Sequence, residues 1–296
     1  MHPTSIKGRL ESFRPSSSRL PFRIAAILAV WLFFATAGAW WLVFLPAQRL
    51  DVQAAQREAD ICEGFLAAEM ARLRATSLDW ANWDDLERYL QTSEEAFAVE
   101  NVTQNALRNL DIDGMLLVKK DGTLQRREVA GPNKSLYMGS ENFLERTGPL
   151  RALAAEKGAS ASVIGSAGHL YVVAAAPVLG TDATGPSSGE VVVFSIVTDA
   201  DVGNYPGIDG ASIALLPPGV EPLAKNTDGD QAQIRAPMVT HPLTGHDGTE
   251  AAQLLIYRED THAELARRSA LYFAAAGVLL AVALYAFCCA RTKTCA

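Results

Sequence analysis

The sequence predicts an α+β protein: a long N-terminal helix, then an antiparallel sheet of about five to seven strands, with two transmembrane helices at the ends. Three observations lead to this prediction. Two long uncharged apolar stretches lie near the ends of the 296-residue chain. Between them, apolar residues first recur with helical spacing. They then form short apolar runs that are separated by turn residues.

The first apolar stretch covers residues 24–45 and contains no charge. Its 22 residues suffice to cross a hydrocarbon core of about 30 Å at about 1.5 Å per residue. A cleaved signal peptide is the alternative, but its apolar core usually has only about 7–15 residues. Residues 46–49 also offer a poor cleavage site. The second uncharged stretch, residues 270–290, is long enough for a second span rather than a buried core helix.

The charges predict the orientation of these spans. Residues 1–23 carry five basic residues and one acid, so this segment should stay in the cytoplasm. The short tail, residues 291–296, should return there. Residues 46–269 would then form a periplasmic domain of a multi-pass protein in the bacterial inner membrane. Arg267 and Arg268 oppose this orientation, but the rule is weak for long loops.

The predicted exterior domain is acidic. It contains 19 basic and 32 acidic residues, which gives a net charge near −13. This balance excludes a basic surface for nucleic acid and gives the domain little attraction to anionic lipid. The lipid bilayer is therefore an expected partner only through the two spans.

Residues 47–90 are predicted to form one long helix. A stripe of apolar or small residues follows heptad spacing and is interrupted at Glu69. The part nearest the first span consists of Val52, Ala55, Ala59, Cys62, Leu66 and Leu73. The stripe predicts the seam of a parallel homodimer, in which two Cys62 thiols face each other and form a disulfide in the oxidising periplasm. The alternative is a stripe that packs on its own domain, with Cys62 as a buried lone thiol.

The strands are predicted from apolar runs and turn residues. Residues 114–118 lead through Asp121-Gly122, a hairpin turn dipeptide, into residues 123–124. A helix over 141–157, with a break near Gly148-Pro149, should separate this hairpin from the later strands. Those strands are expected at 161–165, 169–178, 191–197, 211–216, 234–239 and 252–257, and a short helix at 259–268. Residues 191–194 are apolar on both faces, which favours a sheet that is covered on both sides.

The segment from Asp79 to Leu86, DWANWDDL, is the most distinctive in the chain. Trp80 and Trp83 are three residues apart, so on a helix they share a face. The segment resembles the opening motif of the fourth class of CHASE domains, which are extracellular sensory modules of prokaryotic signalling proteins. The resemblance covers most of residues 50–205. Its later parts are Phe97, Asn101, the strand 115–118 with Asp121-Gly122, the strand ending at Pro177, the loop 185–189 and the strand 191–194.

The resemblance implies a sensor of PAS or Cache type between two spans. Members of the family usually continue into a cytoplasmic output module such as a diguanylate cyclase, a phosphodiesterase or a histidine kinase. Only six residues follow position 290 here. We therefore expect a membrane-anchored sensory domain that lacks its own output module and acts through a cytoplasmic output protein. The alternative is a truncated, non-signalling remnant of a diguanylate cyclase or histidine kinase receptor.

An enzyme is not expected. Gly165-Ser166-Ala167-Gly168 lacks the Gly-x-Ser-x-Gly form of a nucleophile elbow, which disfavours a membrane-anchored hydrolase. Asp84 and Asp85 would point about 100° apart on a helix, a poor acid–base pair. Imidazole and carboxylate suit zinc or nickel, but the spacing of His241 and His246 is not that of a helical ligand pair. We expect a solvated loop there and no metal site.

Any ligand is expected near the sheet face that residues 79–90 reach, by analogy with other sensors. The candidate ligand-binding residues are Trp83, Asp84, Asp85, Tyr137, His169 and Tyr171. The sequence identifies neither the ligand nor a cofactor.

Overall fold

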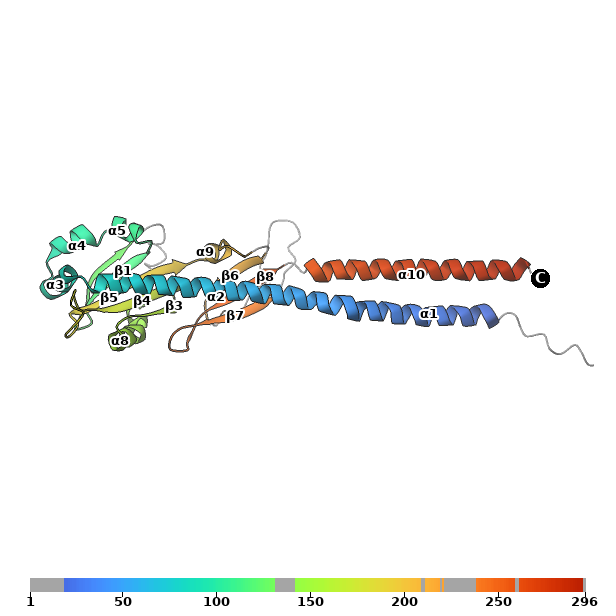
Figure 1. Cartoon of the computed structure of the whole chain (residues 1–296), viewed down its shortest axis with the longest axis horizontal. Coiled ribbons are helices and arrows are strands. Elements are labelled where there is room, and N and C mark those ends of the chain that lie inside the picture. Colours follow the sequence, from blue (N-terminus) through green and yellow to red (C-terminus); the bar gives the residue numbers. More distant parts are fainter. Residues whose placement is uncertain are drawn as a thin grey trace, which may run out of the picture. The chain divides into compact units, whose positions relative to one another are not determined.

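The computed structural model describes residues 19–130, 142–208, 211–218, 220, 238–258 and 261–294. The chain divides into two compact units (Figure 1). The first comprises Met1–Asp51 and Asp260–Ala296, and the second comprises Val52–Glu259.

The first unit contains the two predicted spans. Helix α1 (Arg19–Ala39) leads through a π-helical turn, η1 (Trp40–Phe44), into helix α2 (Leu45–Ala81). Pro46 follows the π-turn and has no N–H to donate to the carbonyl four residues earlier, which accounts for the irregularity. Helix α10 (Thr261–Thr294) joins the predicted short helix and second span into one element. By length and apolar composition, two helices in the described part of the chain could cross a membrane.

Helices α1 and α10 approach each other closely at a glycine. A Cβ added at Gly277 would lie 2.5 Å from Cδ1 of Leu32. Small residues at such positions allow the backbones of membrane helices to come together. The contact is therefore of the kind expected between two spans.

The predicted helix over 47–90 is wrong at its end. Helix α2 stops at Ala81, and helix α3 (Asp84–Thr92) begins after Trp83. Trp83 has an extended backbone, with φ −90° and ψ 121°, and precedes α3 as its N-cap. Trp80 and Trp83 therefore do not share a helical face. Their rings are nevertheless in contact, with centroids 5.1 Å apart.

The second unit is built on a five-stranded antiparallel sheet with the order β2-β1-β5-β4-β3. Two short helices, α4 (Glu95–Asn101) and α5 (Gln104–Asn109), precede it. Two more, α7 (Phe143–Arg146) and α8 (Gly148–Lys157), separate β2 from β3 and match the predicted break. The strands are β1 (Gly114–Lys119), β2 (Leu124–Val129), β3 (Ser160–Ser166), β4 (His169–Val178) and β5 (Gly189–Val197).

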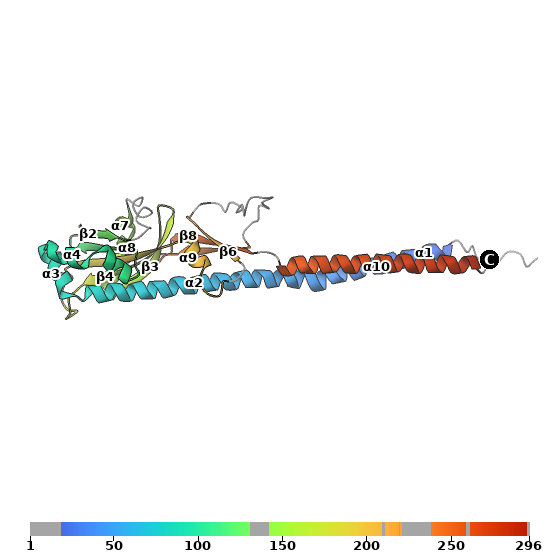
Figure 2. The ribbon, with the colours of Figure 1, turned by 90° about the horizontal axis from the view of Figure 1, so that it is seen from above.

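Both faces of this sheet are covered, as residues 191–194 predict. Successive residues of a strand point to opposite faces, so β1 contributes to two different cores. Met115 and Leu117 pack in the core that contains residues of α2 and α3. Leu116 and Val118 pack in the core that contains Phe143 of α7 and Leu150 of α8. Figure 2 shows α2 along one face of the sheet and α7 on the far side.

The remaining described strands form a separate three-stranded sheet with the order β6-β8-β7. Its strands are β6 (Ala211–Leu216), β7 (Val239–Thr244) and β8 (Glu250–Arg258), and a short helix, α9 (Asp199–Gly203), precedes it. The strand predicted at 234–239 begins only at Val239, and residues 234–237 lie outside the described residues. The strand includes Pro242, which is tolerated because β7 is an edge strand. His241 therefore lies in a strand rather than a loop, where its Nε2 contacts Oε1 of Glu63 on α2.

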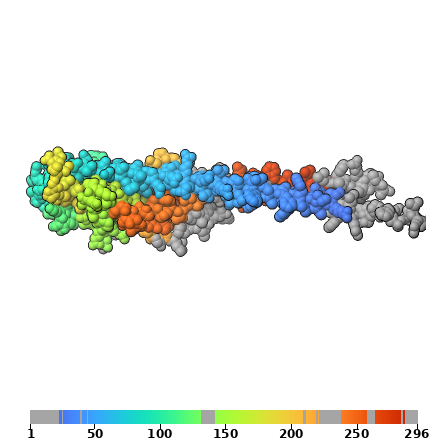
Figure 3. Space-filling model, turned by 60° about the horizontal axis from the view of Figure 1, so that its bottom comes forward, coloured from blue at the N-terminus to red at the C-terminus, as the bar shows by residue number. Residues whose placement is uncertain are grey.

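The predicted dimer seam packs on its own domain. Five of its six residues are at most 4% exposed and belong to the core that α2 shares with both sheets. They are Ala55, Ala59, Cys62, Leu66 and Leu73; only Val52 is exposed, at 49%. The side of α2 that lies on the surface is the opposite one (Figure 3). These five residues therefore present no seam to a second chain, and a homodimer stays a prediction that needs another surface.

Candidate functional site

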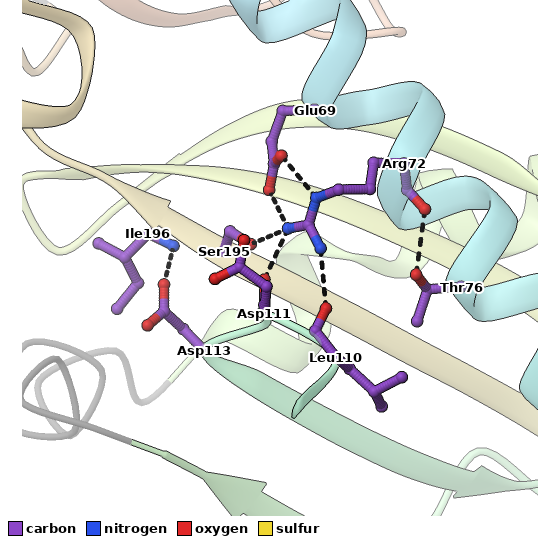
Figure 4. Close-up of polar contacts among 8 residues, drawn as sticks. All are labelled: Glu69, Arg72, Thr76, Leu110, Asp111, Asp113, Ser195 and Ile196. Atoms are coloured by element: carbon purple, nitrogen blue, oxygen red, sulfur yellow. Dashed lines mark hydrogen bonds and ion pairs between the residues drawn. The ribbon is translucent and has the colours of Figure 1, made fainter. Parts of the chain in front are cut away.

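The guanidinium of Arg72, on the sheet-facing part of α2, has polar contacts with four other described residues (Figure 4). Its Nε donates to Oε2 of Glu69 at 2.8 Å, and its Nη2 donates to Oε1 of the same carboxylate at 2.5 Å. Glu69 is one turn earlier on the helix, so the two side chains form a bidentate pair. This hydrogen-bonded carboxylate raises the pKa of Arg72 above its ordinary value.

The same guanidinium also reaches the turn between α5 and β1. Nη1 donates to the carbonyl of Leu110 at 2.9 Å, and Nη2 donates to the carbonyl of Asp111 at 2.6 Å. Nη2 further lies 3.4 Å from Oγ of Ser195 on β5. Asp111 adopts a φ of +55°, a left-handed conformation that is uncommon outside glycine and exposes its carbonyl in this tight turn. One side chain thus joins α2, the α5–β1 turn and β5.

Asp113 fixes the adjoining ends of β1 and β5. Its backbone N–H donates to the carbonyl of Phe194 at 3.0 Å. Its carboxylate accepts a hydrogen bond from the backbone N–H of Ile196 at 2.7 Å (Figure 4). The turn that Arg72 contacts is therefore attached to the centre of the five-stranded sheet.

A cavity of about 620 Å³ lies beside this network. Such a volume is within the usual range of small-molecule pockets. Four acidic and two basic side chains line it, so its formal charge is −2. Its lining is Phe65, Glu69, Arg72, Arg108, Asp111, Ile112, Asp113, Ala130, Ser195, Ile196, Val197, Ala200, Asp201 and Asn204. We name it the Arg72 cavity.

A second cavity, of about 600 Å³, lies between the two sheets. It is formed by the β3–β4 hairpin, the segment from β5 into α9, the end of β6 and the start of β8. Val197 and Ala200 line both cavities, so the two are neighbours. We name it the intersheet cavity.

The predicted residues Trp83, Asp84 and Asp85 line neither cavity. The ring of Trp83 is 46% exposed and contacts Trp80 and Phe97. Oδ1 of Asp84 accepts a hydrogen bond from the backbone N–H of Thr181 at 2.7 Å. Hydrogen bonds from Thr181 hold the pKa of this carboxyl below its usual value. Asp84 thus attaches the β4–β5 loop to α3, and Asp85 forms an exposed ion pair with Arg88.

The other three predicted residues lie elsewhere. His169 lines the intersheet cavity. Tyr171 is fully buried, with its ring centroid 4.7 Å from that of Phe143 and 6.0 Å from that of Phe194. Tyr137 lies outside the described residues. The structure therefore does not gather the predicted ligand-binding residues into one site.

The residues that the sequence reasoning missed are Glu69, Arg72 and Asp113. A signal for the first two was present, because Glu69 interrupts the apolar stripe of α2 and an arginine follows one turn later. A charged pair within such a stripe indicates a buried polar contact. Its partners at Leu110 and Asp111 are about 40 residues away, beyond the reach of local pattern.

Comparison with known proteins points to one family. Residues 65–205 match the family model of the CHASE4 domain. Among solved structures, the periplasmic domain of LuxQ from Vibrio cholerae is similar, with 13% identity and a TM-score of 0.44 over 69% of this chain and 100% of that one. The sensory domain of the Campylobacter jejuni chemoreceptor Tlp3 (CcmL) has 11% identity and a TM-score of 0.41 over 77% and 98%. No curated protein matches the chain.

Proposed function

We propose that residues 46–269 are the periplasmic sensory domain of a receptor anchored by a span on either side, and the match of residues 65–205 to the CHASE4 family model supports this proposal. The two apolar helices and the basic N-terminal segment support this topology. The net charge near −13 of residues 46–269 suits an exterior domain that stays off the membrane surface. In this proposal the domain binds its ligand without converting it.

The hydrogen-bond network around Arg72 is the observation that supports a signalling mechanism through α2. Helix α2 is one element from Leu45 to Ala81, so the helix that follows the first apolar stretch also carries Arg72. Arg72 ties this helix to the α5–β1 turn beside the Arg72 cavity. A ligand that favours one position of α2 over another would shift the population of the receptor between two states. The shift would pass to a cytoplasmic output protein through the spans.

A non-signalling remnant of a longer receptor would retain the sensory domain but not this coupling. The two differ in whether a change at Arg72 alters the contact between the spans. Leu32→Cys and Gly277→Cys together provide a crosslink that reports this contact, because the two positions touch. The four native cysteines are replaced by serine first, and the full-length chain is reconstituted in lipid nanodiscs.

We expect Arg72→Gln to change the rate of oxidative crosslinking between the two spans, because it releases α2 from the turn. Arg88→Gln is the matched control, since among the described residues the side chain of Arg88 forms an exposed ion pair with Asp85 on the same helix, and its loss should leave the rate unchanged. If both variants crosslink at the parental rate while circular dichroism shows a folded domain, the coupling through Arg72 is wrong.

A further inference from the structure

The intersheet cavity is held open by a fixed contact between the two sheets. A Cβ added at Gly165 in β3 would lie 2.0 Å from the carbonyl oxygen of Ala251 in β8. At this point the two backbones touch, so their separation is set by direct van der Waals contact between backbone atoms rather than by adaptable side chains. The cavity beside the contact is therefore preformed.

Its walls are mainly apolar. Aliphatic side chains come from the core ends of four strands, where β4, β5, β6 and β8 converge. The apolar lining residues on these four strands are Leu170, Val197, Leu215, Leu216, Ala251 and Ala252. A ligand body that fills this space should be aliphatic, because each buried methylene group contributes about 0.8 kcal/mol.

Several polar side chains at the cavity can donate hydrogen bonds. Nη1 of Arg146 donates to the carbonyl of Gly165 at 2.5 Å, and no other partner of this guanidinium is found among the described residues. Ser166 is only 6% exposed, and it lines the cavity. His169 adds an imidazole at the end of the same hairpin. The hydroxyl of Ser166 is not among the buried side-chain atoms of the described residues that lack a partner, and it can donate a hydrogen bond to a ligand in the cavity.

One acidic side chain limits the choice of ligand. Asp199 lines the cavity, and its Oδ1 already accepts a hydrogen bond from the backbone N–H of Leu215 at 2.8 Å. Its negative charge opposes a second carboxylate on the ligand. Among the described lining residues, Arg146 is the arginine that can pair with one anionic group of a ligand.

We propose that the intersheet cavity binds a small aliphatic monocarboxylate. The carboxylate accepts hydrogen bonds from Arg146 and Ser166, and the alkyl chain contacts Leu170, Leu215 and Ala252. This goes beyond the proposed function, because it assigns a ligand class to a second cavity. The bound ligand would contact the first strand residues of β8, after which the chain enters α10 at Thr261.

Calorimetric titration of the full-length chain in detergent tests the proposal, with sodium hexanoate as the probe. Hexanamide, hexylamine and succinate are the comparison compounds. We expect hexanoate to bind, and the other three to bind at least about tenfold more weakly, since a hydrogen bond between charged groups is lost or a like charge is introduced. Arg146→Gln should weaken hexanoate binding by about tenfold or more, and Ser166→Ala by a smaller factor. The matched control Arg88→Gln should have no effect.

Arg146→Lys keeps the positive charge but loses the planar fork, so it should bind hexanoate between the wild type and Arg146→Gln. If Arg146→Gln fails to fold, the hexanoate affinity of Arg146→Lys tests whether the guanidinium of Arg146 binds the carboxylate. Absence of hexanoate binding to the wild type at millimolar concentration overturns the proposal, as does equal binding of hexanamide or preferential binding of hexylamine. Hexanoate that binds without changing the crosslinking of Leu32→Cys to Gly277→Cys leaves the ligand site standing and counts against the proposed signalling function.

Discussion

Gly165 in β3 and Ala251 in β8 bring the two sheets of the second unit into direct backbone contact, where no side chain fits between them. We expect Gly165→Ala to lower the free energy of unfolding by about 1–3 kcal/mol, because the methyl group forces the sheets apart. Thermal or urea denaturation of the full-length chain measures this loss. Gly148→Ala is the matched control, since nothing lies within 4 Å of a Cβ there. A Gly165→Ala variant as stable as the control would mean that the sheets separate freely.

Arg72→Lys tests whether the forked geometry of the guanidinium matters as well as its charge. Lysine cannot hold both oxygens of Glu69 and two backbone carbonyls at once. We expect a loss of about 1–3 kcal/mol in the free energy of unfolding. Arg88→Lys, in an exposed pair, should cost less than about 0.5 kcal/mol. A double-mutant cycle with Glu69→Gln should show coupling, and additive effects would contradict the bidentate pair.

Cys62 should be inert in the folded protein. Its side chain is fully buried, and burial, with the nearby charge of Glu58, raises the pKa of the thiol to about 11. At pH 8 only about a thousandth of such a thiol is ionised, and the thiolate is the reactive form. Maleimide should label Cys62 only after denaturation, whereas a cysteine introduced at the exposed Val52 should react at once. Equally fast labelling at both positions, or a disulfide-linked dimer through Cys62, would show that α2 leaves the sheets.

The same thiol gives a dependence of stability on alkaline pH. Its pKa rises from the ordinary cysteine value of 9.0 to about 11 in the fold, so the folded state keeps a proton that the unfolded state loses. The stabilising contribution is complete below pH 9 and disappears as pH rises through 11. The expected loss is about 1.4 kcal/mol per pH unit in that window. Cys62→Ala should show a shallower loss between pH 9 and pH 11; identical slopes would exclude the thiol as the cause.

The proposed topology predicts opposite results for two fusions. Alkaline phosphatase folds in the periplasm, so a fusion at Gly185 should be active and a fusion after Ala296 inactive. Green fluorescent protein at the same two positions is the complementary reporter and should fluoresce only after Ala296. The reverse pattern in both reporters would overturn the orientation.

Most strands were predictable because their signals are local. Asp121-Gly122 marks the first hairpin, and the apolar run 191–194 indicates a central strand buried on both faces. The break after Ala81 was not predictable, since neither glycine nor proline interrupts Asn82-Trp83 and the apolar spacing continues through it. The break depends on Thr181, almost a hundred residues away, which hydrogen-bonds to Asp84.

The candidate cavities could not be predicted from pattern alone. Arg72 acts through the backbone carbonyls of Leu110 and Asp111, and any residue type can supply a carbonyl. The division of the strands into two sheets likewise depends on which strand edges meet, which hydrophobic alternation does not specify. His169 was identified as a candidate, but its neighbours in the cavity come from β6 and β8, far along the chain.

A strand that is apolar on both faces loses nothing in burial if it slides by one residue, so β5 has no hydrophobic preference for its alignment. The register of the β1–β5 pair is instead restricted sterically, by two glycines at positions where no Cβ fits. Gly114 lies opposite Phe194, and a Cβ there would be 2.1 Å from that ring. At the other end of the pair, a Cβ at Gly189 would be 2.3 Å from the carbonyl oxygen of Val118. A β1–β5 ladder in another register would place a side chain in one of these two close contacts. The two glycines therefore favour the observed register of the β1–β5 pair.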